Sequence, residues 1–432
     1  RLATDQEVLG SNPSRRKKMN KIKKSYQISI LLIAAFFIRV IAYYFFGDAQ
    51  LENEWKILVH NLYEKNILGF YVLDKDLGVI PKMAEQPDLV LPSAFMPPLY
   101  AYIVFIFKYI FSSYFDFVFV IILFQIILST ITCYLFYKIV LTYLDPHISF
   151  YTSVIFSLVP ISIFACVQIS SITIQVFFLT YFLYLLRLFS SEKKIKLKNL
   201  IILSLLSGFL ILLRGEFILF YILTLIYFFC FFSKKYKLFL SSLIITLFII
   251  SPYLMRNYYQ FNTFTITKSI GYNLLKGNNP NFKVEGNPTY IENKFNKKDL
   301  VIATDKRYEI NLDNFYKQEA IKNITSDPFL YFKNYLLKVF SFIFLDFNSS
   351  YENYFNVFHI LPKIVLSIFS LIGAIISLQK KGYNQYLSLY FFSNIFFFSI
   401  FFILPRYSLI LLPIQFLLSI QFVKYLNRKF FN

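Results

Sequence analysis

Acidic side chains gather in the first long polar segment of an otherwise apolar and basic chain. Two of them, Asp48 and Glu54, lie close to the end of the first apolar segment. A carboxylate held beside a membrane surface can act as a general base toward a hydroxyl or an amine. The alternative is a solvated cluster with no chemical role, and the residues alone leave open which carboxylate would take the proton. The acidic residues of this segment are Asp48, Glu52, Glu54, Glu64, Asp74, Asp76, Glu85 and Asp88.

The spacing of these acids leads to one local expectation. If the first helix continues past residue 46, Asp48 and Glu52 lie four residues apart on one face, and Glu54 points away from them. The last four of the eight acids, from Asp74 to Asp88, are expected at a solvated surface.

Cationic side chains at the ends of later apolar segments form a second candidate group. Arginine suits phosphate because its planar guanidinium donates two parallel hydrogen bonds. Any one of these cations could simply reach the lipid headgroups. Four of them on one predicted side of the membrane favour an anionic, lipid-borne ligand. They are Arg214, Arg256, Lys268 and Arg406.

Other kinds of site find little support in the sequence. The histidines His60, His147 and His359 are far apart, and the three cysteines lie within apolar runs, so we expect no metal site. The chain lacks a phosphate-binding loop of the P-loop kind, so we expect no nucleotide and no other cofactor.

Composition indicates the elements that must position these groups. Of the 432 residues, 57% are apolar and 16% are charged, and the mean hydropathy is +0.55. Several uncharged runs approach the roughly 20 residues that cross a bilayer. Such segments must be helices because lipid cannot form hydrogen bonds with backbone N–H and C=O groups. The sequence therefore predicts an all-α polytopic membrane protein. Lysines beside apolar runs set orientation and meet anionic headgroups, which explains the net charge of +20 without nucleic acid.

The apolar runs predict about ten transmembrane helices and two interfacial helices. Lys21, Lys23 and Lys24 precede the first span and place the N-terminus in the cytoplasm, so the segments after the first and seventh spans are external loops. The predicted spans are 28–46, 117–141, 148–165, 168–187, 199–213, 216–232, 237–255, 361–378, 386–404 and 408–425. The predicted interfacial helices are 99–112 and 333–347.

This topology divides the chain into four parts. Residues 1–27 form a cytoplasmic tail, in which residues 1–18 precede Met19 and read as an over-extended reading frame. Residues 28–255 form a transmembrane catalytic module that includes the first external loop, 47–116. Residues 256–360 form a second external region with an interfacial helix, and residues 361–432 form the last helices and a cytoplasmic tail.

Two proline- and glycine-containing stretches lie in the external regions. The Pro97–Pro98 pair suits the start of a helix. Residues 251–280 end in Gly-Tyr-Asn and Gly-Asn-Asn-Pro turns. These turns could wrap sugar hydroxyls, or they could belong to an ordinary loop.

In their order along the chain, these motifs resemble the C-type (GT-C) membrane glycosyltransferases. The nearest branch is that of the bacterial relatives of the protein O-mannosyltransferases and lipid A aminoarabinose transferases, which is glycosyltransferase family 39-like. The likeness covers residues 28–425 and rests on order rather than on any single motif. It is carried by the acidic first loop with Asp48, Glu54-Trp55 and Asn61-Leu62, by Pro97 to Tyr100, by Leu213-Arg214 after Gly208, by Pro252 to Asn257 with Gly271 to Pro280, by Glu319-Ala320 to Asp327-Pro328, and by Pro405-Arg406-Tyr407.

The resemblance implies a donor, an acceptor and roles for the candidate residues. The donor would be a sugar linked to polyprenyl phosphate, and the acceptor an extracytoplasmic lipid, glycan or protein. Asp48 or Glu54 would be the general base for a displacement with inversion, and the four cations would hold the phosphate. The protein would lie in a bacterial inner membrane with its site outside. The chain departs from the family in its widely spaced acids and in Thr173, where relatives often carry an acidic residue.

Two other classes of protein share some of these features. A transporter or lipid flippase predicts repeated halves and broken helices near the midplane, whereas here the polar residues collect at one face and in two long external regions. A glycan ligase or polymerase would use the same kind of lipid-linked donor, and the sequence separates it poorly from a glycosyltransferase.

Overall fold

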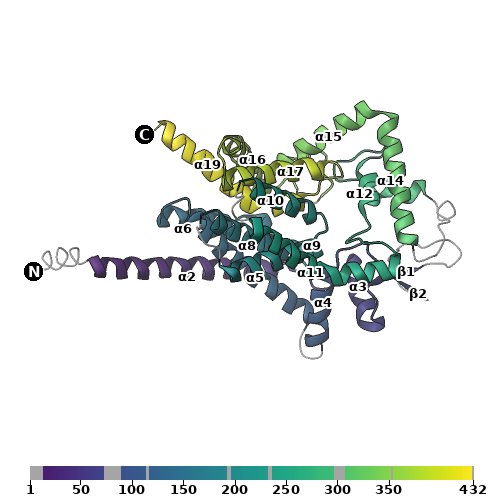
Figure 1. The fold of residues 1–432 in the computed structure, drawn as a ribbon, viewed down its shortest axis with the longest axis horizontal. Coiled ribbons are helices and arrows are strands. Elements are labelled where there is room, and N and C mark those ends of the chain that lie inside the picture. Colours follow the sequence, from purple (N-terminus) through teal and green to yellow (C-terminus); the bar gives the residue numbers. More distant parts are fainter. Residues whose placement is uncertain are drawn as a thin grey trace, which may run out of the picture.

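The computed structural model describes residues 13–72, 89–112, 116–191, 196–231, 236–295, 307–351 and 354–430. Within these ranges the chain is built of helices α2 to α19 and one pair of short strands (Figure 1). The predicted all-α polytopic membrane class is confirmed. Of the acids expected at a solvated surface, Asp74, Asp76, Glu85 and Asp88 lie outside the described residues.

Five helices are long and apolar enough to cross a membrane. They are α2 (Pro13–Phe46, apolar over Tyr26–Phe46), α5 (Phe117–Val140), α8 (Ile172–Ser191), α11 (Tyr236–Phe261) and α16 (Val357–Leu378). The predicted third span is a bent pair, because α6 (Pro146–Ser157) and α7 (Pro160–Cys166) meet at 59°. The count of about ten spans stays a prediction.

The remaining helices include shorter apolar ones and those of the external regions. Their bounds are α3 (Asn53–Lys65), α4 (Pro98–Phe111), α9 (Leu197–Leu213), α10 (Phe217–Phe231), α12 (Ile270–Gly277), α13 (Pro288–Lys294), α14 (Tyr308–Ser326), α15 (Pro328–Ile343), α17 (Tyr383–Ser399), α18 (Pro405–Ile410) and α19 (Leu412–Phe430). The predicted interfacial helices correspond to α4 and α15, and the expected helix start at Pro98 is confirmed.

Local chemistry explains where several helices begin. The side chains of Asp116, Asp327 and Asn356 accept hydrogen bonds from backbone N–H groups in the first turns of α5, α15 and α16. These bonds satisfy donors that a helix start otherwise leaves free. Proline occupies the first turn of α4 and α15, where its missing N–H costs nothing.

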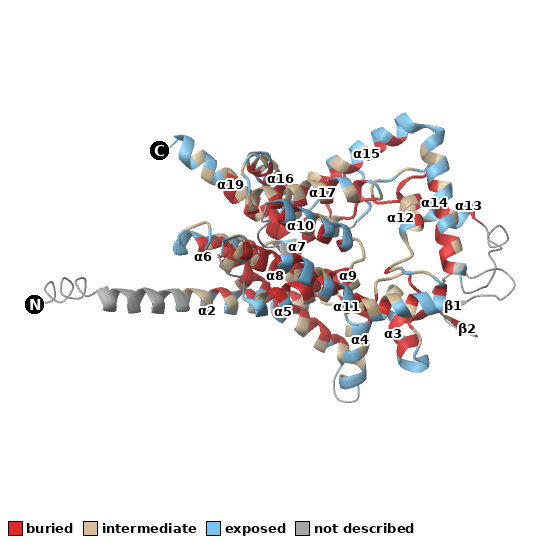
Figure 2. Cartoon of the chain, viewed as in Figure 1, coloured by how far each residue is buried: buried red, intermediate tan, exposed pale blue. Residues whose placement is uncertain are grey.

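The core lies where α5 and α8 pack against each other and where α16 packs along α19 (Figure 2). Among the candidate spans α8 is the most enclosed, with 67% of its apolar window buried, whereas α2 lies at the edge with 22%. Gly373 allows the close approach of α16 and α19, because a Cβ there would stand 1.9 Å from the Leu418 carbonyl oxygen. Arg39 crosses from α2 to α5 and donates through Nε to Ser129 Oγ at 2.7 Å.

The two regions predicted to be external are more ordered than loops. The first contains α3, the antiparallel strands β1 (Gly69–Val72) and β2 (Leu89–Pro92), and α4. The second contains α12 to α15, which lie at the same end of the molecule as α3 and the strands (Figure 1). Both ends of the chain lie at the opposite end of the bundle.

The helix of the first span does not continue outward. It ends at Phe46, and a new helix starts only at Asn53. The expectation that Asp48 and Glu52 share one helical face is therefore wrong, because the helix ends before Gly47 and residues 47–52 are not helical. Conversely, α11 runs through Pro252 to Phe261, so Arg256 lies on a helix rather than in a loop.

Candidate functional site

Asp48 is anchored to the turn between α7 and α8. Its backbone N–H donates to the Val167 carbonyl at 3.2 Å, and its Oδ2 accepts from the Ile169 N–H at 2.7 Å. Its other carboxylate oxygen has no hydrogen-bond partner among the described residues. Burial raises the pKa of Asp48, the Ile169 N–H lowers it, and the nearby charge of Glu52 raises it. One oxygen is thus oriented while the other is available to a proton donor.

A buried glutamine on α5 holds that turn in place. Gln125 is fully buried, and its Nε2 donates to the Gln168 carbonyl at 2.8 Å and to the Cys166 carbonyl at 3.2 Å. Its Oε1 accepts from the hydroxyl of Tyr100 on α4 at 3.2 Å. The backbone partners of Asp48 are therefore positioned by a side chain in the interior of the bundle.

Glu54 lies on the first turn of α3 and faces α12. The next residue, Trp55, packs edge-on against Tyr100 with ring centroids 4.8 Å apart. The charge of Glu54 acts on Tyr272 and Lys276 of α12. Burial raises the pKa of Tyr272 to about 12, with added contributions from Glu292 and Glu54. Glu54 thus has a cationic neighbour, and Asp48 does not have one among the described residues.

Cations gather around the start of α18. Arg406 is exposed there, and it acts on Lys276: burial lowers the pKa of Lys276, Arg406 lowers it further, and Glu54 opposes both. The Lys276 ammonium lies 4.4 Å from the centroid of the Phe402 ring. These cations come from α12 and α18, which are far apart in sequence.

Arg214 joins this group through Tyr407. Its guanidinium lies 5.7 Å from the Tyr407 ring centroid, and its Nε donates to Glu216 at 2.7 Å. Burial alone would lower the pKa of Arg214, but Glu216 and Tyr407 outweigh it and leave that pKa raised. Both Arg214 and Arg406 act on the Tyr407 hydroxyl, whose pKa burial raises. We call Arg214, Lys276, Arg406 and Tyr407 the external cation group.

The sequence of part of this chain matches a known family. The family described as dolichyl-phosphate-mannose-protein mannosyltransferase matches residues 96–255, from α4 into α11. No curated protein gives a significant match over the sequence.

Solved structures from Archaeoglobus fulgidus extend the likeness to nearly the whole chain. One is the archaeal oligosaccharyltransferase AglB in complex with an inhibitory peptide and a dolichol-phosphate, at 12% identity and a TM-score of 0.53, covering 94% of this chain and 51% of that one. Another is an oligosaccharyltransferase tethered to an acceptor peptide containing the NVT sequon, at 13% identity and a TM-score of 0.54, covering 94% and 50%. The chain has the fold of the GT-C membrane glycosyltransferases. The resemblance seen in the motifs is confirmed at the level of the fold, and the chain spans about half the length of these two proteins.

The GT-C fold does not bring all four predicted cations together. Arg256 donates to the Leu68 carbonyl at 2.8 Å, and to the Ser93 carbonyl at 2.9 Å. Lys268 donates its backbone N–H to the Ala94 carbonyl at 2.7 Å. Both residues therefore lie at the base of the β1–β2 pair, whereas Arg214 and Arg406 belong to the external cation group.

The same base holds a carboxylate that sequence reasoning did not single out. Glu309 on α14 is 2% exposed. It accepts from the Ser93 hydroxyl at 2.5 Å and from the Ala94 N–H at 2.7 Å. Burial raises the pKa of Glu309 to about 7, against the lowering effect of these bonds and of Arg256. Nothing in its local sequence distinguishes it from the other acids of a polar helix.

The Gly-Asn-Asn turn has a structural role. The Asn278 amide donates to the Leu274 and Ile400 carbonyls, both at 2.8 Å. Asn279 Nδ2 donates to the Lys276 carbonyl at 2.9 Å. These amides terminate α12 and tie it to the end of α17, so the turn does not present their donors to a sugar. Lys276 lies in the same stretch and belongs with Arg406 at the site. In the sequence, a basic side chain within a Gly- and Asn-containing segment was the feature that could have indicated this role.

Proposed function

We propose that the chain transfers a sugar from a polyprenyl-phosphate donor to an extracytoplasmic acceptor. The family matched by residues 96–255 is named for a dolichyl-phosphate-mannose donor, and a fold neighbour was solved with a dolichol-phosphate. The observation that carries the proposal is Asp48, whose carboxylate is oriented by one backbone N–H and keeps its second oxygen free for a proton donor. The proposed setting is a bacterial inner membrane with both termini in the cytoplasm.

The proposed step is a direct displacement at the anomeric carbon. Asp48 takes the proton of the acceptor hydroxyl or amine while the acceptor atom forms its bond to that carbon. The bond from the anomeric carbon to the phosphate oxygen breaks, and its electron pair leaves with the polyprenyl phosphate. The configuration inverts because the acceptor attacks opposite the leaving group. Arg406, Lys276 and Arg214 stabilise the charge that develops on the phosphate.

The two first-loop carboxylates take different roles in this proposal. Burial raises the pKa of Asp48, and a base works best when its pKa approaches the working pH. Glu54 instead acts on Lys276, so its proposed role is to orient that cation. The alternative assignment, with Glu54 as the base, is decided by the same experiment.

That experiment uses the full chain in proteoliposomes with polyprenyl-phosphate mannose carrying labelled mannose as the probe. Release of labelled mannose or its transfer to an added acceptor is measured for Asp48→Asn and Glu54→Gln. We expect Asp48→Asn to lower the rate by about 10²- to 10⁴-fold, as for loss of a general base, and Glu54→Gln by about tenfold. The reverse order would make Glu54 the base, and full activity in both would remove a first-loop base altogether.

A lipid flippase remains the second candidate because of one observation. The bent pair α6–α7 is the broken helix that such a protein predicts. A flippase moves the intact lipid-linked sugar across the bilayer without breaking the bond to phosphate. Transbilayer movement of the intact probe, with no released polyprenyl phosphate, would favour that class. Comparing surface glycans and lipid-linked sugars of cells with and without the protein would then identify the sugar and acceptor.

A further inference from the structure

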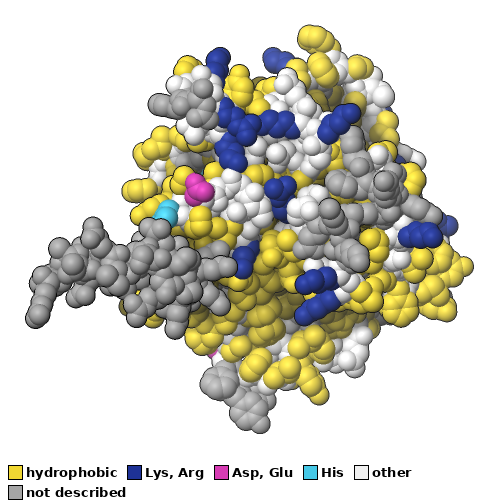
Figure 3. All heavy atoms as spheres, turned by 60° about the vertical axis from the view of Figure 1, so that its left-hand side comes forward, with side chains coloured by type: hydrophobic (Ala, Val, Ile, Leu, Met, Phe, Trp, Pro, Cys, Tyr) yellow, Lys and Arg dark blue, Asp and Glu magenta, His cyan; other side chains and the backbone are white. Residues whose placement is uncertain are grey.

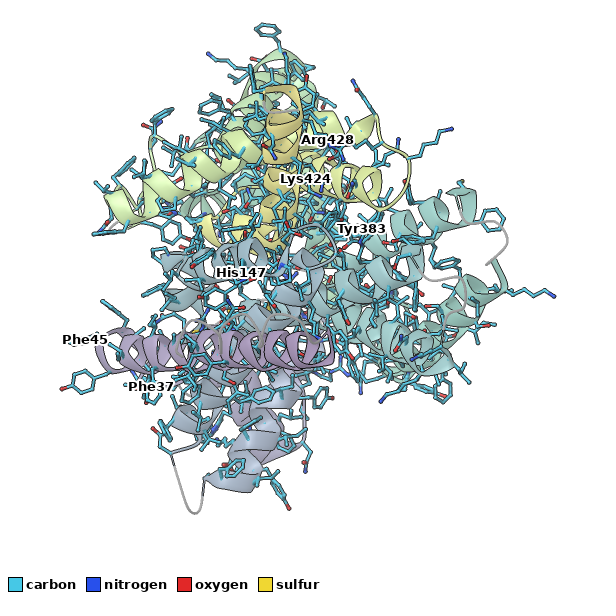
Figure 4. The ribbon with its side chains drawn as sticks, turned by 90° about the vertical axis from the view of Figure 1, so that its left-hand side faces the viewer. Phe37, Phe45, His147, Tyr383, Lys424 and Arg428 are labelled. Atoms are coloured by element: carbon cyan, nitrogen blue, oxygen red, sulfur yellow. The ribbon has the colours of Figure 1, made fainter. Side chains whose placement is uncertain are left out.

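A second group of cations lies at the end of the bundle opposite Asp48, where both chain termini are found. Its members come from three helices that are distant in sequence, and Lys and Arg side chains gather on this face (Figure 3). Lys424 and Arg428 lie four residues apart on α19, at the end of that helix (Figure 4). The four cations are Arg187 on α8, Lys380 just after α16, and Lys424 and Arg428 on α19.

One aromatic ring brings two of them together. The Arg187 guanidinium lies 4.5 Å from the centroid of the Tyr143 ring, and the Lys424 ammonium lies 5.8 Å from the same centroid. Arg187 is also fixed by its Nε, which donates to Thr142 Oγ1 at 2.9 Å. Burial and the charge of Arg428 lower the pKa of Lys380, so these side chains repel one another. We call the four cations and Tyr143 the Tyr143 cluster.

Few carboxylates lie near the cations of the Tyr143 cluster to neutralise their charge. Among the described residues none of its cations forms an ion pair with a carboxylate, and Asp145 is near enough only to act on Lys424. Positive charge at a helix end by itself reflects membrane orientation. That general role does not require Arg187 and Lys424, which come from two helices distant in sequence, to meet at one ring.

A buried amide beneath the cluster is the independent sign of a ligand. The Tyr143 hydroxyl donates to Asn384 Oδ1 at 2.8 Å, and Asn384 Nδ2 donates to Gln421 Oε1 at 3.3 Å. Gln421 is 4% exposed, and its Nε2 has no hydrogen-bond partner among the described residues. A buried donor without an acceptor is costly. Gln421 lies one turn before Lys424 on α19, so an acceptor atom reaching this donor would meet the cations as well.

We propose that the Tyr143 cluster binds the phosphate group of an anionic phospholipid. A phosphate offers several acceptor oxygens, which match the guanidinium and ammonium donors and the free Gln421 amide. The cluster lies at the ends of the candidate spans α8 and α16, where lipid headgroups are found. A headgroup bound there would offset the repulsion and join α8, α16 and α19. The site is separate from the external cation group and does not depend on the proposed transfer reaction.

The test titrates the purified full chain in detergent with phosphatidylglycerol and counts bound lipid by native mass spectrometry. Each cation removed should weaken binding about fivefold, because a basic side chain at a membrane surface contributes about that much. The triple variant Arg187→Gln, Lys424→Gln, Arg428→Gln should therefore bind about a hundredfold more weakly. Phosphatidylcholine, which carries no net charge, should bind more weakly to the unaltered protein.

The matched control removes three charges of the same face outside the cluster. It is Lys138→Gln, Lys196→Gln, Lys429→Gln, and its affinity should stay within about twofold of the unaltered protein. Arg428→Gln alone, at an exposed position, tests the site without risk to folding and should lose about fivefold. Equal affinities of the triple variant and the control would overturn the proposal. Displacement of the lipid by an equal concentration of inorganic phosphate would overturn the assignment to a lipid.

Discussion

Two carboxylates held by backbone N–H groups lie in the regions predicted to be external, and their environments differ. Both oxygens of Glu309 accept hydrogen bonds, and the side chain is 2% exposed. Asp48 accepts at one oxygen only, from Ile169 N–H, and is partly open. A polar group whose hydrogen-bonding atoms are all bonded within the protein stabilises the fold. A polar group with an unbonded donor or acceptor atom is free to bind a ligand.

The same contrast separates two of the predicted phosphate-binding arginines. Arg256 donates to two backbone carbonyls at the base of the β1–β2 pair. Arg406 is exposed, has no hydrogen bond among the described residues, and faces Lys276 and Tyr407. The sequence placed both at the external end of a span, and only their partners distinguish an anchor from a candidate ligand-binding group.

The largest expected effects on stability and on substrate binding come from substituting Arg256 and Arg406. Arg256→Gln removes charged hydrogen bonds to the Leu68 and Ser93 carbonyls, and we expect it to lower the free energy of unfolding by about 4 kcal/mol. Arg406→Gln should leave thermal unfolding unchanged and raise the KM for polyprenyl-phosphate mannose more than tenfold. Thermal unfolding in detergent and steady-state kinetics measure the two changes. Equal unfolding temperatures for the two variants would erase the distinction between the arginines.

Glu309 makes stability depend on pH in a defined direction. Because its pKa is raised from 4.5 to about 7, the folded protein holds a proton that the unfolded chain releases between those values. The contribution of Glu309 to the free energy of unfolding is therefore complete below pH 4.5 and is lost as the pH rises through about 7. This loss amounts to about 3 kcal/mol. Glu309→Gln resembles the protonated acid and should remove this component. The check is the difference in unfolding temperature between pH 5 and pH 8, and an unchanged difference in Glu309→Gln would contradict the assignment.

Gln125 tests whether the turn before α8 positions the Asp48 carboxylate. Gln125→Leu releases the Cys166 and Gln168 carbonyls and loosens the turn that orients Asp48. We expect kcat to fall up to a hundredfold, because a displaced catalytic group loses about that much per ångström. Hydrogen exchange over residues 166–171 should also speed up.

Tyr100→Phe is the matched control for this variant, because it removes one bond to Gln125 and leaves the Gln125 contacts to the turn in place. It should change both measurements much less. Fast exchange with full activity in Gln125→Leu would show that the turn does not position the base.

The smallest expected effect is a shift of the acidic limb of the pH–rate profile. The charge of Glu52 raises the pKa of Asp48, so Glu52→Gln should lower that pKa and move the limb to lower pH by a few tenths of a unit. The maximal rate should stay unchanged because Glu52 is exposed and its carboxylate accepts a hydrogen bond from Gln50 rather than bonding to Asp48. A shift toward higher pH would remove Asp48 as the titrating base.

The sequence by itself determined the membrane class, the location of the long apolar helices and of the helices α4 and α15, and the acidic residue next to the first span. These follow from local rules, since an apolar run of sufficient length must be helical in lipid, and proline or a capping side chain marks a helix start. That α4 and α15 lie at the membrane interface stays a prediction. The order of motifs also identified the GT-C fold, which the comparisons confirm.

Only the tertiary structure decided which polar groups are free. Arg256 and Arg406 have the same chemistry and a similar place beside a predicted span, and the carbonyls that occupy Arg256 come from residues 188 and 163 positions away. Lys276 comes under the charges of Glu54 and Arg406 in the same way, because the fold brings these residues near one another although they are distant in sequence. The capacity of a hydrogen-bonding side chain depends on neighbours that are distant in sequence, and a single sequence does not reveal them.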